Sequence, residues 1–380
     1  MPRFPTVAPH VRAIQGGVYS KFAARIAALE GEVYPLNVGD TWMEPIKGAR
    51  MEDLSVADHP GMHRYTGTRG MPALVDAIAE RRGIDPGRIL VTASGTAGLK
   101  ILANALLSPG DEVMILAPYW PLIAGIVKTS SGTPVEVPFL DLGGEDIVAR
   151  LEAYRTDKTV AIYLNTPNNP TNQTYPRHVV QAIADFARAH DLWIWTDEIY
   201  EDYVYRGELH PIADMAPERT FAAFSFSKAY GLAGLRTGYL VGPSTEAVAE
   251  VHKVGLYSYY SAPTPGQLSA LHVIRHGQPW VDRAFESYKA AGDHAARALG
   301  VPQPGGGQFL FLDVSPYLDA RGLQGFLSDC LDRNLVLAPG SSFGPNNYSD
   351  FVRICFTCAP PDVVRRGIEI FAGLLDEKRA

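Results

Sequence analysis

The sequence contains few cysteines. Only three occur among 380 residues, at Cys330, Cys355 and Cys358, and so odd and sparse a set argues against a disulfide framework. The last two form a C-x-x-C in "CFTC". They continue the strand-like run "FVRICF", in which residues three apart point to opposite faces and cannot share a metal. We therefore expect these thiols to pack in the core, and we predict no metal site.

Long apolar runs and clusters of basic residues are also missing. No apolar run approaches the roughly 18 residues that a membrane helix needs, and the start "MPRFPTVAPHVRAIQGG" lacks the apolar region of a secretory signal. The formal net charge is -7, without the basic patch expected of a nucleic-acid binder. These absences exclude membrane and nucleic-acid partners and predict a cytoplasmic protein.

Short apolar runs alternate with longer amphipathic segments along most of the chain. The strand-like runs are nearly continuous in apolar residues, as expected of a sheet covered on both faces. They occupy residues 88–94, 111–117, 133–139, 159–165, 192–198, 220–226 and 237–242. Helical patterns, such as 96–107 and 177–190, lie between them. The pattern predicts an α/β fold with a doubly wound, mostly parallel sheet.

The C-terminal part has a different organisation. Expected helices near 279–298 and 360–377 flank three strand-like runs at 308–314, 335–339 and 351–356. This arrangement predicts a second, smaller α+β domain. We expect a large domain at 45–275 and a small domain formed by 1–44 together with 276–380.

Polar and charged residues follow several of the apolar runs. Function in a doubly wound sheet is expected at the carboxyl ends of its strands, where the sequence places Ser94-Gly95-Thr96, Asn169, Asp197 and Lys228. An ammonium beside a buried strand costs free energy unless it is paired, neutralised or chemically used. Hydroxyls at a helix start suit a phosphate, a carboxylate suits a pyridine nitrogen, and a lysine suits an aldehyde. Together they indicate pyridoxal 5'-phosphate, whereas each alone also fits a plain helix N-cap or a surface lysine.

Six motifs carry a resemblance to a known family. They are "YTGTRG", "APYW", "NTPNNPT", "TDEIYEDY", "SFSKAYGLAGLRTGY" and "FVRICF". From about Val33 to the C-terminus the chain resembles the fold type I, class I/II pyridoxal-phosphate-dependent aminotransferases, which include aspartate aminotransferase. The spacing matches as well, with 28 positions from Asn169 to Asp197, 31 from Asp197 to Lys228 and 8 from Lys228 to Arg236.

The resemblance implies catalytic roles for three residues. Lys228 would form a Schiff base with the cofactor and then move the proton from the α-carbon of the substrate. Asp197 would pair with the pyridine nitrogen. Tyr200 would hydrogen-bond the phenolic oxygen of the cofactor, and Asn169, as a binding residue, would contact the same oxygen.

Further cofactor contacts follow from the same resemblance. Trp120 would stack on the cofactor ring, although a tryptophan in the core is the alternative. Tyr65 would reach the phosphate of the neighbouring subunit, which implies a homodimer with shared active sites. The implied phosphate contacts within one chain are Ser94, Gly95, Thr96, Ser225, Ser227 and Arg236.

Substrate contacts are implied for Asn169, Gly39, Arg353 and Tyr257. Arg353 matches the arginine that binds the α-carboxylate, with a buried structural ion pair as the alternative. Gly39 would leave room for the substrate beside that carboxylate. Aspartate-specific relatives carry a second arginine, from the neighbouring subunit, roughly where Tyr257 stands here. No arginine lies between positions 253 and 267, which favours an aromatic or large neutral donor, although the tyrosines there fit a dimer interface equally well.

Two residues depart from the family pattern. Asn172 stands where a glycine is usual, and we expect the turn to survive because asparagine tolerates a left-handed conformation. Gln308 stands where an aromatic residue is common, and its amide is expected to contact either the substrate or only the domain hinge.

The predicted function is an aminotransferase that moves an amino group from an L-amino acid to a 2-oxo acid in two half-reactions. Another reaction of the same cofactor, such as β-elimination or oxidation, is the alternative on the same fold. A cofactor-binding regulatory protein is a further alternative.

Overall fold

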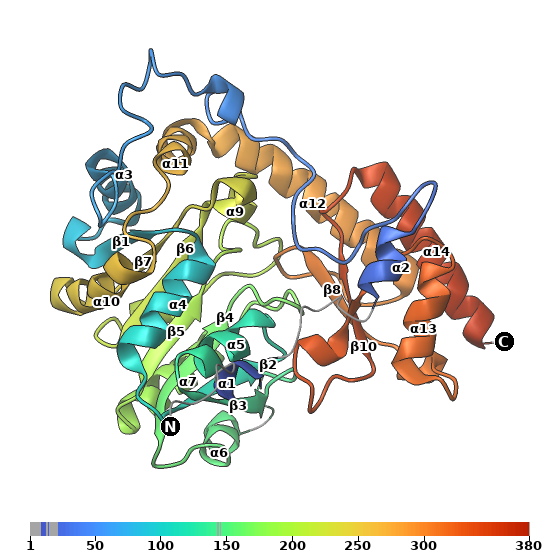
Figure 1. The fold of residues 1–380 in the computed structure, drawn as a ribbon. Coiled ribbons are helices and arrows are strands. Elements are labelled where there is room, and N and C mark those ends of the chain that lie inside the picture. Colours follow the sequence, from blue (N-terminus) through green and yellow to red (C-terminus); the bar gives the residue numbers. More distant parts are fainter. Residues whose placement is uncertain (1–8, 13, 15–21, 143, 145, 380) are drawn as a thin grey trace, which may run out of the picture.

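The computed structural model describes residues 9–12, 14, 22–142, 144 and 146–379. Its larger part is built on a seven-stranded sheet with the strand order β1-β7-β6-β5-β4-β2-β3 (Figure 1). Six strands of this sheet run in the same direction, and β7 runs antiparallel to both of its neighbours, β1 and β6. The strands are β1 (Ile89–Thr92), β2 (Glu112–Ala117), β3 (Thr133–Pro138), β4 (Thr159–Asn165), β5 (Trp193–Asp197), β6 (Thr220–Ser225) and β7 (Gly238–Val241). Each lies within one of the seven predicted runs, so the α/β prediction is confirmed.

Helices cover both faces of this sheet, which is why its strands are apolar throughout. In β4, Ala161 and Tyr163 face one layer, while Ile162 and Leu164 face the other, because successive side chains of a strand alternate. The first layer contains α4 (Gly95–Leu106), α5 (Leu122–Thr129) and α10 (Thr245–Ser258). The second contains α3 (Pro72–Arg82), α6 (Ile147–Glu152), α7 (Arg177–Ala189), α8 (Ile212–Met215) and α11 (Thr264–His276).

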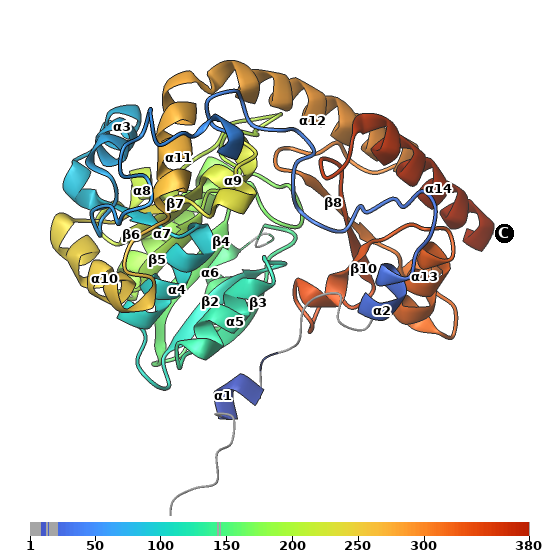
Figure 2. The same ribbon diagram turned by 45° about the horizontal axis from the view of Figure 1, so that its top comes forward.

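A smaller antiparallel sheet forms a second body beside the first. Its order is β8-β10-β9, with β8 (Phe309–Asp313), β9 (Ala338–Pro339) and β10 (Phe351–Cys355). The long helix α12 (Gln278–Leu299) leads from the large sheet to the small one, which α13 (Gly322–Leu331) and α14 (Pro361–Arg379) also cover (Figure 2). The predicted second α+β unit is therefore present.

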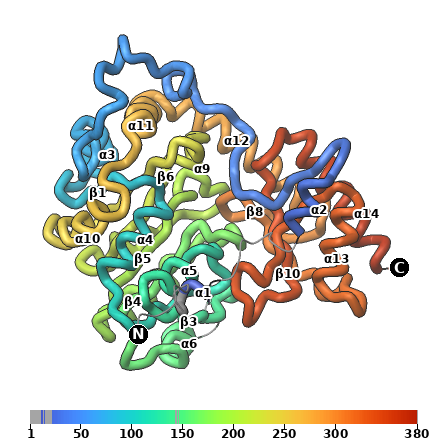
Figure 3. Tube along the Cα trace, in the orientation of Figure 1, coloured from blue at the N-terminus to red at the C-terminus, as the bar shows by residue number. Residues whose placement is uncertain are grey.

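The N-terminal segment runs along the small sheet and then returns to the large one (Figure 3). After α1 (Pro9–Arg12) and α2 (Ala23–Ala27), Tyr34 forms a bridge with Leu335. The Cys355 N–H then donates to the Leu36 carbonyl at 2.8 Å, and the Trp42 N–H donates to the Thr357 carbonyl at 3.0 Å. These hydrogen bonds hold the N-terminal segment so that Gly39 lies between the two sheets.

The C-x-x-C pair does not lie on one strand. β10 ends at Cys355, and Cys358 lies in the bend that follows. The Cys358 thiol donates to the Cys355 carbonyl at 3.4 Å. The prediction that the two side chains point to opposite faces of a strand is therefore wrong, because the strand stops before Cys358. Cys330 and Cys355 are buried as expected, whereas Cys358 is partly exposed.

Asn172 adopts the left-handed conformation that the turn requires, with φ at +61°. Its side-chain Oδ1 also accepts the Phe309 N–H at 3.0 Å, at the start of β8. The turn thus survives the loss of glycine, and the asparagine ties this loop to the small sheet. Gln308 beside it is fully buried, and its amide has no hydrogen-bond partner among the residues that the structure describes.

Within the described ranges, none of the helices combines the length and the apolar composition that a bilayer span requires. The remaining short elements are α9 (Phe226–Ala229) and five 3-10 turns at 51–53, 86–88, 233–235, 315–317 and 340–342.

Candidate active site

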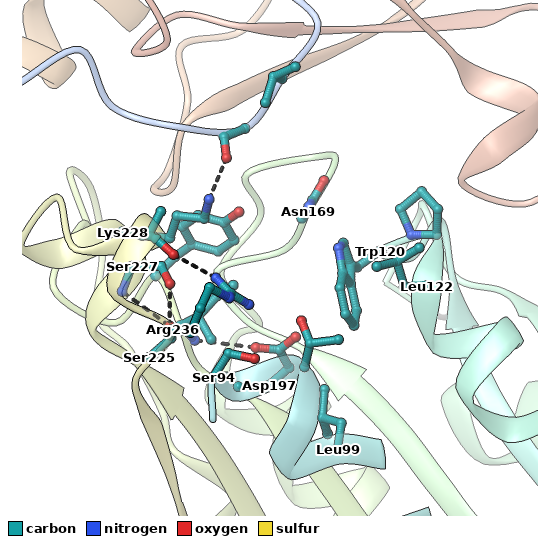
Figure 4. Close-up of a pocket in the computed structure, with 18 of the residues that line it drawn as sticks. Ser94, Leu99, Trp120, Leu122, Asn169, Asp197, Ser225, Ser227, Lys228 and Arg236 are labelled. Carbon is teal, nitrogen blue, oxygen red and sulfur yellow. Dashed lines mark hydrogen bonds between the residues drawn. The ribbon is translucent and has the colours of Figure 1, made fainter. Parts of the chain in front are cut away.

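A cleft of about 380 Å³ opens at the carboxyl ends of β1, β4, β5 and β6, between the two sheets. It collects thirteen of the fifteen predicted site residues, which come from both sheets and from the N-terminal segment (Figure 4). These are Gly39, Ser94, Gly95, Thr96, Trp120, Asn169, Asp197, Tyr200, Ser225, Ser227, Lys228, Arg236 and Arg353. Gln308 is not among the lining residues, so the structure does not support a contact between its amide and the substrate.

Lys228 lies on the single-turn helix α9, directly after β6. Ser225 begins that turn, and its Oγ accepts the Ser227 N–H at 3.1 Å. The Lys228 Nζ points into the cleft and donates to the Gly39 carbonyl (Figure 4). Burial lowers the pKa of Lys228, and Arg353 and Arg236 act in the same direction, against Asp40 and Cys355. A larger fraction of this amine is therefore neutral, as a nucleophile or base must be.

Asp197 ends β5 at the floor of the cleft. Its Oδ2 accepts the Tyr163 hydroxyl at 3.0 Å, and its Oδ1 accepts the Ile199 N–H at 3.4 Å. Burial raises the pKa of Asp197 to about 6, although both hydrogen bonds oppose the rise. The carboxylate is therefore ionised at neutral pH and can pair with a cationic group in the cleft.

One wall of the cleft is suited to an anion. Ser94 precedes α4 with φ at +97°, a conformation that is strained for a residue with a side chain, and its Oγ accepts the Ala97 N–H at 3.2 Å. The backbone N–H groups of Gly95 and Thr96 open this twelve-residue helix, where its dipole favours negative charge. Arg236 lies nearby and uses one nitrogen to donate to the Ala233 carbonyl at 2.6 Å. Together they form a wall that is suited to an anion.

Arg353 reaches the cleft from β10, on the opposite side. Its guanidinium donates to the Asn169 Oδ1 at 2.9 Å and to the Asn37 carbonyl at 2.5 Å. It also lies 4.2 Å from the ring centre of Phe309 and 4.7 Å from that of Phe343. Every one of these partners is neutral, and Nε has none among the described residues. The contacts do not support the structural ion-pair alternative, and they leave a buried cation available for a carboxylate.

Comparison with known proteins places this site in a family. The model of the aminotransferase class I and II family matches residues 32–371. The chain belongs to this family. The aspartate/prephenate aminotransferase of Thermus thermophilus is 31% identical over 332 residues, covering 83% of this chain and 84% of that protein. The arginine–pyruvate transaminase of Pseudomonas aeruginosa is 29% identical, covering 87% of this chain and 86% of its own length.

Solved structures agree with this assignment. A single mutant of the Thermus thermophilus aspartate aminotransferase has a TM-score of 0.89 at 28% identity, covering 98% of this chain and all of the other. A tetra mutant of that enzyme complexed with tryptophan has a TM-score of 0.88 at 29% identity, with the same coverage. The predicted family, fold class and transaminase activity are confirmed.

Three other predicted residues complete the cleft of this aminotransferase. Tyr200 is buried and packs edge-on against Phe309, with ring centres 5.7 Å apart. Trp120 faces the cleft from the side opposite Lys228 (Figure 4). A Cβ on Gly39 would come within 2.6 Å of the Phe309 ring. The missing side chain therefore makes room for that ring, in addition to any room it leaves for a substrate.

Tyr65 and Tyr257 lie outside the cleft of this chain. Their exposed fractions are 82% and 94%, and Tyr65 packs edge-on against Tyr260, with ring centres 4.9 Å apart. Tyr65 and Tyr257 are expected to contact the active site of the neighbouring subunit. In a single chain of this aminotransferase, their roles therefore stay predictions.

Several residues of the site escaped the sequence analysis. Phe309 and Phe343 hold Arg353 between their rings, and nothing local in "QFLFLDV" or "SSFGP" distinguishes them from core residues. Tyr163 contacts Asp197 from the next strand. The sequence could have indicated this contact. Tyr163 stands two positions before Asn165 and therefore lies on the same face of β4, and Asn165 is paired with Asp197.

Proposed function

We propose that this aminotransferase binds pyridoxal 5'-phosphate and works in two half-reactions, taking an amino group from an L-amino acid and passing it to a 2-oxo acid. The observation that carries the proposal is the set of groups in one cleft. This cleft holds a lysine with a lowered pKa, a buried carboxylate, a wall suited to an anion, and the Arg353 guanidinium, whose partners among the described residues are neutral. This donor set fits the phosphate, the ring nitrogen and the aldehyde of the cofactor, with Arg353 left over for a substrate carboxylate.

The proposal gives separate tasks to the polar residues of the cleft and to Trp120. Ser225, Arg236 and the start of α4 would bind the phosphate, while Asp197 would receive the ring nitrogen. Tyr200 and Asn169 would bind the phenolic oxygen, and Trp120 would pack against the ring. When bound, the cofactor supplies an aldehyde that bonds amines and a protonated ring that accepts electrons. Lys228 would take the proton from the substrate α-carbon and return it at the cofactor carbon, which requires the neutral amine that burial favours.

Arg353 would bind the α-carboxylate of the substrate, and a substitution tests this role. Arg353→Lys keeps the charge but loses the planar fork, so one charge-assisted hydrogen bond of about 2 kcal/mol is lost. We expect the KM of the amino donor to rise roughly thirtyfold, with a smaller change in kcat. Steady-state kinetics on Arg353→Lys checks the result, and the matched control is Arg366→Lys, a partly buried arginine outside the cleft lining. An unchanged KM would contradict the assignment.

We also propose that the donor side chain is aromatic or otherwise large and neutral. The remaining lining residues all have apolar side chains: Val38, Leu99, Pro121, Leu122, Ile199, Ala233 and Phe343. Among the described lining residues the cations are Lys228, Arg236 and Arg353, and each already has a role. A side-chain carboxylate would lie in this cleft without a partner, at a cost on the order of 3 kcal/mol.

The donor proposal predicts a substrate ranking. We expect kcat/KM for phenylalanine, tyrosine and methionine to exceed that for aspartate and glutamate by roughly a hundredfold. The measurement is a donor panel with a fixed 2-oxo acid, in which released ammonia is followed beside the keto product. A preference for aspartate would refute the neutral pocket, and repeated ammonia release would indicate elimination or oxidation instead of transamination.

A homodimer belongs to the same proposal. Tyr65, Tyr257 and Tyr260 are exposed aromatic residues, and exposed aromatic surface is typical of an interface. We propose that Tyr65 contacts the phosphate in the partner's cleft and that Tyr257 contacts the substrate there.

A further inference from the structure

Tyr163 is a buried polar residue for which the proposed chemistry has so far no use. It lies in the middle of β4, with its side chain fully buried. β4 and β5 pair in parallel, with Tyr163 beside Trp195 and Asn165 beside Asp197. All four side chains therefore share one face of the sheet, and the Tyr163 ring lies beneath the end of β5. Its hydroxyl reaches up to Asp197 Oδ2 at 3.0 Å.

Asp197 depends on few donors. Besides Tyr163, its carboxylate accepts the Ile199 N–H at the longer distance of 3.4 Å. No lysine or arginine of the described chain forms an ion pair with it. Burial raises the pKa of Asp197, and the Tyr163 hydrogen bond is the larger of the two effects that oppose the rise. Tyr163 is therefore the strongest stabilising contact of this carboxylate.

The other titratable groups near this pair do not take over that task. Tyr175, from the segment before α7, and Tyr200, from the loop after β5, face Tyr163 and have raised pKa values, so both are neutral at working pH. Glu198, although next to Asp197 in sequence, accepts the Thr196 hydroxyl at 3.1 Å and interacts with Glu201 and Arg82. The Tyr163 hydroxyl is thus the main hydrogen-bond donor to the Asp197 carboxylate at the edge of the cleft.

We propose that Tyr163 is a positioning residue of the active site that acts through Asp197. Its hydroxyl occupies Oδ2, fixes the orientation of the carboxylate and keeps it ionised for the ring nitrogen of the cofactor. This inference rests on the proposed binding of pyridoxal 5'-phosphate. Tyr163 is not among the residues that line the cleft, so its effect must pass through the carboxylate.

Removal of the hydroxyl should weaken the partner of the ring nitrogen without changing the shape of the cleft. Tyr163→Phe leaves Oδ2 with no donor among the residues that the structure describes, which favours the protonated carboxyl group. A hydrogen bond to a charged group corresponds to a factor of roughly 10 to 100. We expect the dissociation constant of the cofactor to rise about tenfold and kcat to fall by a similar factor.

The test uses the full-length protein loaded with pyridoxal 5'-phosphate labelled with ¹⁵N in its ring. The ¹⁵N chemical shift reports whether the ring nitrogen is protonated, and a pH titration gives its midpoint. We expect this midpoint to fall in Tyr163→Phe, together with a weaker cofactor affinity measured by titration of the cofactor-free protein.

Tyr205→Phe is the matched control. Tyr205 is also a buried tyrosine, and its hydroxyl donates to the Gly307 carbonyl at 2.6 Å, outside the cleft lining. It loses a comparable hydrogen bond without touching Asp197, so its ¹⁵N midpoint should equal that of the wild type. In an Asp197→Ala background, Tyr163→Phe should change cofactor affinity less than threefold, because its partner is gone.

The outcomes separate the two proposals. A wild-type protein that binds no pyridoxal 5'-phosphate or does not transaminate refutes the proposed function. A wild-type protein that does both, beside a Tyr163→Phe variant that matches Tyr205→Phe in ¹⁵N midpoint and affinity, overturns the role of Tyr163. If Tyr163→Phe does not fold, 3,5-difluorotyrosine at position 163 replaces it. Its more acidic hydroxyl is a stronger donor and should raise the midpoint, and an unchanged midpoint overturns the proposal.

Discussion

Lys228→Ala is expected to lower kcat/KM for the best amino donor by a factor of at least about a thousand, because in the proposed reaction this side chain supplies both the nucleophile and the base. The substitution removes the amine that donates to the Gly39 carbonyl and leaves the wall of Ser225, Arg236 and α4 intact. The cofactor should therefore still bind, held by its phosphate and ring contacts without a covalent link. Steady-state kinetics and the absorbance of the retained cofactor measure the two effects.

Lys100→Ala is the control for this experiment. Lys100 lies on α4, outside the cleft lining, and it is partly buried with a lowered pKa. Its ammonium donates to the Thr129 hydroxyl at 2.8 Å and to the Ser130 hydroxyl at 2.9 Å. We expect nearly normal kinetics from it. A Lys228→Ala protein that transaminates as well as this control would disprove the assignment of the catalytic lysine.

Asp197→Asn is expected to have opposite effects on activity and on stability. The amide keeps the shape of the carboxylate but cannot balance a protonated ring nitrogen, so kcat should fall by roughly a hundredfold or more. The stability of the cofactor-free protein should rise, because an ionised carboxylate is no longer held in a buried site without a cationic partner.

The pH dependence of this stability has a definite sign. The pKa of Asp197 is raised from 3.8 to about 6 in the folded chain, so the folded state binds the proton more tightly than the unfolded state does. The cost of the ionised form is fully present above pH 6, where it corresponds to about 3 kcal/mol, and it disappears as pH falls below about 4.

Denaturant unfolding of the cofactor-free Asp197→Asn and wild-type proteins at several pH values tests this prediction. The free energy of unfolding of the variant should exceed that of the wild type near pH 8, and the two values should converge toward pH 4. A pH-independent difference would show that burial of the Asp197 carboxylate does not govern the stability of the protein. Wild-type turnover in the cofactor-loaded Asp197→Asn variant would refute the role of Asp197 in the reaction.

The seven strands of the large sheet were predictable because each is a short apolar run bounded by polar residues. Parallel strands also place their carboxyl ends at one edge, so Ser94, Asn169, Asp197 and Ser225 could be expected to meet. Asn172 could be predicted as well, since its left-handed φ is a local property of the backbone.

Contacts between distant segments were not predictable in this way. Cys358 was misplaced because the end of β10 depends on how the following bend packs, and not on the pattern "FVRICF" itself. The aromatic rings around Arg353 come from β8 and from the 340–343 turn, and the space for Phe309 comes from Gly39, about 270 positions away in sequence. The sequence pattern of either segment alone does not predict a contact between them.

The sequence by itself determined the fold class, the family and the residue types of the cleft, because alternation, strand-end chemistry and motif spacing are local or nearly local properties. Only the tertiary structure decided the electrostatic state of those residues. The lowered pKa of Lys228, the raised pKa of Asp197 and the neutral surroundings of Arg353 all arise from burial and from partners on other strands. Desolvation and hydrogen bonding depend on what the folded chain places around a charge, and not on its neighbours in sequence.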